Sequence, residues 1–226
     1  LDDAMKAAAS NSTFGMADAA QASLNFARAG LDAAQAASAI APAMNLAAGE
    51  AGNLDTVSKG LVGTINAFGD SFEQTEHYAD VFAAACNNSA LEVNTLSESM
   101  SVAAPVFKTA GKSVEDAALM LGVMANANID ANTAANSLKT GMARLAEPTK
   151  QAKKAMEQYG IAMSDIWNED GSMKEMTVIQ ENLNKSFSKL SEQEQMAAAG
   201  AIFGKNQMSE WLAVSNTAPA KVQALN

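Results

Sequence analysis

Apolar residues recur along this chain at intervals of three and four positions, which is the spacing of one face of an α-helix. The clearest case is a run separated by 3, 4, 4 and 3 residues, formed by Leu54, Val57, Leu61, Ile65 and Phe68. Such a run places five apolar side chains on one side of a helix of four turns. The pattern predicts a chain built from amphipathic helices.

Three glycines divide much of the chain into a weak repeat. Gly30, Gly69 and Gly111 are spaced by 39 and 42 residues, and an apolar residue stands four positions before each. This is the pattern of a helix whose last turn is closed by glycine. Candidate caps for the next helix follow each glycine, at Asp32, Ser71 and Ser113. The repeat predicts antiparallel helix pairs stacked in series.

The individual helices follow from these signals. We expect helices over 1–10, 16–29, 33–48, 54–68, 72–86, 90–109, 114–127, 131–145, 149–159, 177–190 and 207–214, with one more opened by Ser191. Capping boxes, in which a hydroxyl and a carboxylate or amide bond reciprocally to the first turn, are predicted at Ser71, Ser89, Ser113 and Ser191. Pro42 and Pro105 are predicted to kink or interrupt their helices, because proline lacks the backbone donor.

The residues that follow the third helix pair show a different sequence pattern. Asn168–Gly171 has the composition of a turn, and it predicts a short β-hairpin near residues 161–177. The expected fold is therefore all-α, an irregular solenoid or bundle of serial antiparallel helical hairpins. We divide it into N-terminal helices at 1–30, a repeat region at 31–147 and a mainly helical part at 148–226.

Composition and charge remove several classes of function. The chain of 226 residues has 49 alanines but only 5% aromatic residues, which favours helices over sheets. Its net charge is −10, and residues 1–138 carry all of that excess. Binding of nucleic acid by a basic surface is therefore disfavoured. No apolar run has the length of a membrane-spanning helix.

Motifs for catalysis, metals and nucleotides fail when their spacing is tested. A calcium loop with Gly171 at its sixth position would need carboxylates where Ile166 and Thr177 stand. Neither of the two glycine-rich patterns that bind phosphate groups, GxxxxGK(S/T) and GxGxxG, occurs in the chain. Carboxylate pairs such as Glu115/Asp116 and Glu192/Glu194 lie at predicted helix starts, where they act as caps. We therefore predict no enzyme, no catalytic, cofactor or metal site, and no cofactor.

His77 and Cys86 are the single histidine and the single cysteine of the chain. They are nine residues apart on one predicted helix, whereas a pair that reacts together would be separated by three or four. Cys86 is expected to be a small core residue and His77 a surface or half-buried one. The sequence assigns neither of them a role.

A series of short segments, taken in order, resembles the core region of bacteriophage tail tape measure proteins. The likeness extends over about residues 16–214 and lies in the following segments: Phe26–Leu31, Ala43–Ala47, Thr64–Gly69, Tyr78–Ala85, Val102–Val106, Ala118–Asn126, Arg144–Thr149 and Ala201–Gly204. Gly160 and the Asp170-Gly171 pair lie between the last two. Asn128 departs from the glycine usual at its turn, and His77-Tyr78 is bulkier than expected on an Ala-rich face.

The resemblance implies a structural protein of the virion rather than an enzyme. Such proteins lie in the lumen of the tail tube, set tail length and leave ahead of the DNA. The implied partners are tail tube and tail tip proteins, tail assembly chaperones and further copies of the chain, as a trimer or hexamer. Synthesis in the cytoplasm of the host bacterium is implied as well. Because family members are much longer, we interpret this chain as a fragment.

An alternative from another class stays open at this stage. A helical solenoid adaptor without any phage connection, or a secreted pore-forming helical protein, would have the same composition and periodicity. Tail tube and tail tip genes beside this gene would favour the phage interpretation, whereas a secretion or signalling operon would favour the alternative.

Overall fold

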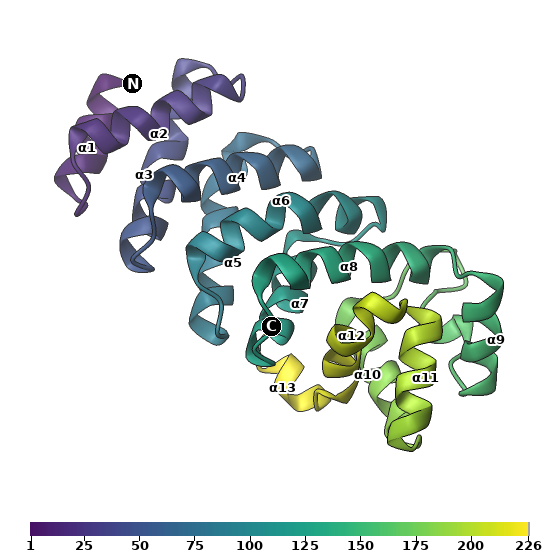
Figure 1. Ribbon diagram of the computed structural model, residues 1–226. Helices are drawn as coiled ribbons and strands as arrows, with labels where there is room; N and C mark the ends of the chain where they lie inside the picture. The colour runs from purple at the N-terminus through teal and green to yellow at the C-terminus, as the bar shows by residue number, and fades with distance from the viewer. Residues whose placement is uncertain (226) are drawn as a thin grey trace.

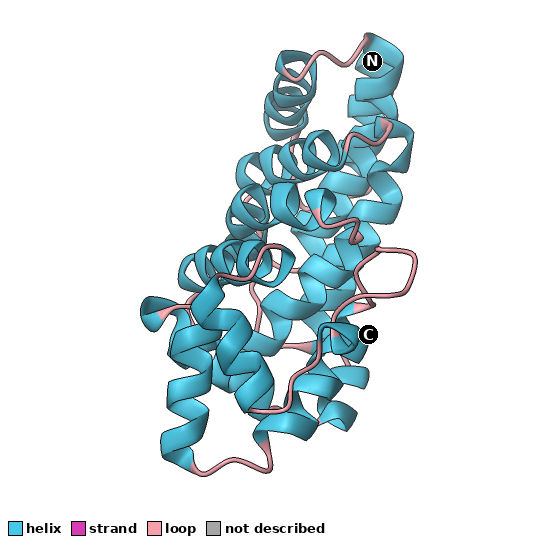
Figure 2. Ribbon diagram, turned by 90° about the vertical axis from the view of Figure 1, so that its right-hand side faces the viewer, coloured by secondary structure: helices cyan, strands magenta, loops and turns pink. Residues whose placement is uncertain are grey.

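The computed structural model describes residues 1–225 and contains helices but no strand within them (Figure 2). Eight helices form four consecutive hairpins: α1 (Asp2–Ser10), α2 (Met16–Arg28), α3 (Ala33–Gly49), α4 (Leu54–Phe68), α5 (Thr75–Asn88), α6 (Val93–Thr109), α7 (Val114–Asn126) and α8 (Ala131–Ala146). The hairpins follow one another along the molecule, from the N-terminal hairpin at one end to α8 (Figure 1). The predicted all-α architecture of serial hairpins is confirmed.

The hairpins stack into two layers. In one layer α2, α4, α6 and α8 pack side by side, and in the other α1, α3, α5 and α7 do so. Helices α4 and α6 come close together at Gly60, which has no side chain to hold the backbone of Ser97 away. Helix α4 buries one apolar stripe that includes Leu54, Leu61 and Phe68, as their spacing predicts.

Glycine closes three of the helices as the sequence predicts. Gly30, Gly69 and Gly111 have φ angles of 93°, 71° and 69°, in the left-handed region that favours glycine. After each glycine, the next residue donates its N–H to the carbonyl of the apolar residue four positions before that glycine. Asn128 takes the same conformation with φ 58°, which an asparagine side chain tolerates.

The predicted caps are confirmed at three helix starts and are wrong at two. Asp32, Ser113 and Ser191 form capping boxes at α3, α7 and α11 (Glu192–Ile202). Ser71 instead caps a 3₁₀ turn over Phe72–Gln74, where its hydroxyl accepts the N–H of Glu73 at 3.3 Å, and α5 begins at Thr75.

At Ser89, the expected capping box does not form, and the next hairpin supplies a contact instead. Asn126 accepts the N–H of Ala90 at 2.8 Å, while the Ser89 hydroxyl donates to the carbonyl of Ala85. The helix that was expected to begin at Ala90 begins at Val93, and the Ser89 hydroxyl accepts the N–H of Leu91 at 3.2 Å instead of that of Glu92.

Proline does not interrupt either helix in which it occurs. Pro42 lies within α3 and Pro105 within α6, and both helices continue past it. The carbonyls left without an intrahelical partner belong to Ser38 and Ser101, which are exposed. Water can hydrate a carbonyl at such positions, so the loss of one hydrogen bond is tolerated.

The C-terminal part forms a small bundle against the last hairpin. It contains α9 (Lys150–Gln158), α10 (Met176–Phe187), α11, α12 (Met208–Asn216) and α13 (Pro219–Gln223). Helix α12 packs against α7 and α8, which are the last helices of the two layers (Figure 1). There the Trp211 indole lies against Gly141, donates to the carbonyl of Ser137 at 3.1 Å and stacks on Phe203 with ring centroids 4.2 Å apart.

The predicted β-hairpin forms only as a single bridge. Trp167 pairs with Met173 across a turn in which Gly171 has φ 84°. Before the turn, Met163–Asp165 winds into a 3₁₀ helix because the Asp165 carboxylate accepts the N–H of Ala162 at 2.7 Å. After it, α10 begins at Met176, so neither side is long enough for a strand.

Candidate functional site: the two faces of the helical array

The two layers of the array differ sharply in charge. Helices α1, α3, α5 and α7 contain six acidic residues and one lysine, and we call them the acidic layer. Helices α2, α4, α6 and α8 contain three acidic and five basic residues, and we call them the polar layer. The excess of acid in residues 1–138 is thus gathered on one side of the molecule and at the turns.

A shallow groove crosses the acidic layer between α3 and α5. Its volume is about 460 Å³, and its charged lining consists of Glu50, Glu76 and Asp80. Small residues form most of the rest, including Pro42 and Ala83. An acidic surface of this kind repels phosphate groups.

The polar layer presents uncharged polar side chains beside charged ones of both signs. Exposed amides and hydroxyls follow one another across its helices, at Asn66, Ser101, Thr109, Asn132, Thr133 and Asn136. Such groups form hydrogen bonds with another protein and carry no net charge to be neutralised. This face suits contact with protein better than the acidic layer does.

A network of buried side chain–backbone hydrogen bonds joins the array to the C-terminal bundle. The Lys112 ammonium is buried and donates to the carbonyls of Met173 and Lys174 at 2.8 and 3.1 Å. Asp116 accepts the N–H of Met176 at 3.3 Å and thereby caps α10 from a distant helix. Burial raises the pKa of Asp116, and its hydrogen bonds oppose that shift. The network orients two parts of the fold, and a pocket of about 350 Å³ beside it is lined by Lys112, His77 and Tyr78 among others.

His77 and Tyr78 have structural contacts. The His77 Nε2 atom lies 2.9 Å from a carboxylate oxygen of Glu115, which joins α5 to α7 at an exposed position. The buried Tyr78 hydroxyl donates to Asp70 at 2.6 Å, and burial raises the pKa of this phenol. An aromatic ring is thereby accommodated in an Ala-rich array.

Cys86 is a core residue, as the sequence predicts. Its side chain is buried, and burial raises the pKa of the thiol to about 12. A thiol that stays protonated at neutral pH is a poor nucleophile. Cys86 therefore contributes packing rather than chemistry.

One carboxylate of each predicted pair, Asp116 or Glu194, takes part in a capping box. Glu194 accepts from the backbone and hydroxyl of Ser191, and these hydrogen bonds lower the pKa of Glu194. Asp116 likewise accepts the backbone N–H of Ser113, and the Ser113 hydroxyl accepts the N–H of Asp116. Over residues 1–225, no three His, Cys, Asp or Glu side chains are grouped so as to hold a metal ion. Of the helices in that range, none is both long and apolar enough to span a bilayer.

These features define a class: a two-layered helical scaffold whose surfaces differ in charge. The family model for phage-related minor tail proteins matches residues 2–204, so the chain belongs to that family of phage tail components. It is 30% identical to the tape measure protein of Pneumococcus phage Dp-1 over 94% of this chain, and 31% identical to the probable tape measure protein of Escherichia phage P2 over 85%. No solved structure matches it.

The relatives are several times longer than this chain. The aligned region makes up 18% of the Dp-1 protein and 23% of the P2 protein. The family resemblance predicted from the ordered segments is confirmed. The turn at Asn128, which departs from the glycine usual there, keeps the left-handed geometry.

Proposed function

We propose that this chain is a region of a tape measure protein that lies in the lumen of the tail tube, contributes to setting tail length and leaves ahead of the DNA. The observation that carries the proposal is its similarity, over most of its length, to two proteins named tape measure proteins. Membership in the family of phage-related minor tail proteins supports a structural role.

The same proposal includes its partners. Tail tube and tail tip proteins, tail assembly chaperones and further copies of the chain, as a trimer or hexamer, would bind it in a virion assembled in the bacterial cytoplasm. The polar layer, with its exposed amides and hydroxyls, is the face we assign to protein contacts.

For the acidic layer we propose a different task. A protein that shares a narrow channel with DNA must not adhere to it, and like charges repel. The carboxylates around the α3/α5 groove, together with Asp2, Asp3 and Glu115, give this layer the negative charge that repels DNA. The acidic layer would therefore face the path of the genome.

The solenoid adaptor and the secreted pore-forming protein remain the alternatives for a helical array considered without its relatives. Membership in the tail protein family favours the phage interpretation over both. Genes for tail tube and tail tip proteins beside this gene would be expected.

The acidic layer can be tested by DNA binding. We expect the purified chain to leave duplex DNA unshifted in a native gel at low salt, even at about 10 μM protein, where nonspecific binding by basic surfaces is easily seen. A variant with Glu73, Glu76 and Asp80 replaced by lysine should shift the DNA, because it creates a basic patch on α5 and the turn before it. Micromolar binding by the unmodified chain would contradict the non-adhesive role.

A further inference from the structure

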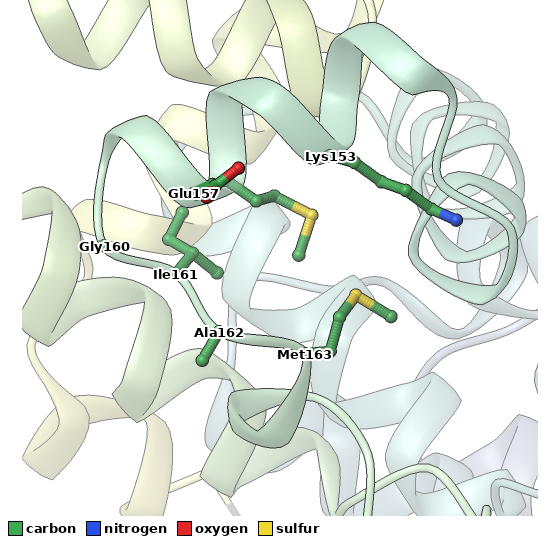
Figure 3. A pocket seen from close by; sticks show the side chains of 7 residues that line it. Lys153, Glu157, Gly160, Ile161, Ala162 and Met163 are labelled. Carbon is green, nitrogen blue, oxygen red and sulfur yellow. The ribbon is translucent and has the colours of Figure 1, made fainter.

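We draw no further inference here: the strongest candidate, the apolar groove of about 440 Å³ that Met156, Ile161 and Met163 line beside α9 (Figure 3), is an unpartnered apolar face, and nothing in the structure shows what covers it.

Discussion

Replacing Gly60 by valine is expected to lower the free energy of unfolding by about 3 kcal/mol or more, because it forces apart two helices of the polar layer. A Cβ atom at this position would overlap the Ser97 side chain and lie 2.8 Å from the Ser97 Cα atom. The Ser97 backbone is part of α6 and cannot rotate away, so the hairpins would have to separate. Urea denaturation followed by circular dichroism measures the loss.

Gly63→Val, on the same helix, is the matched control. A Cβ atom there meets nothing within 4 Å. Removing a helical glycine changes stability by less than about 1 kcal/mol in the favourable direction. Equal losses in the two variants would show that helix propensity, rather than the contact of α4 with α6, sets the stability of the array.

Replacing Trp211 by alanine is expected to cost about 3–5 kcal/mol, which is the range for truncating a fully buried large aromatic side chain. The indole is 0% exposed, stacks on Phe203 and donates to Ser137. Its loss would open a cavity between α12 and the last hairpin. We therefore expect the C-terminal bundle to detach first, seen as faster hydrogen exchange in α10 to α12 than in α4 and α6.

Trp167→Ala provides the comparison, because that residue lies half-buried at the single β bridge. We expect Trp167→Ala to lower the free energy of unfolding by less than Trp211→Ala does, and to speed hydrogen exchange only near the turn. If the two tryptophan variants lost the same stability and exchanged alike, the account of Trp211 as the joint between array and bundle would be wrong.

The sequence predicts most of the helices because their signals are local. Apolar spacing, a cap such as Asp32 and a terminal glycine such as Gly69 act within one or two turns, and tertiary contacts agree with them. The prediction fails at Ser89, whose hydroxyl donates to the carbonyl of Ala85 and accepts the N–H of Leu91 rather than that of Glu92, while Asn126, 36 residues away along the chain, accepts the N–H of Ala90.

Contacts between distant segments could not be predicted in the same way. Lys112 meets carbonyls 61 and 62 residues later, and Trp211 meets a carbonyl 74 residues earlier. Nothing in the local sequence marks Lys112 as buried, since lysine is usually exposed. The separation of charge between the layers also depends on which helices lie side by side, whereas the sequence shows only that residues 1–138 are acidic.

The most direct measurement of the central claim uses a thiol at an exposed position of the polar layer. Cys86 is buried with a raised pKa, so Ser101→Cys would supply the single reactive thiol of this region. In phage that carry this change in the full-length protein, with its other thiols replaced, we expect a bulky maleimide to leave intact virions unlabelled and to label the protein after DNA ejection. The isolated chain should react readily in solution. Equal labelling of intact and ejected particles would contradict a place in the tail lumen.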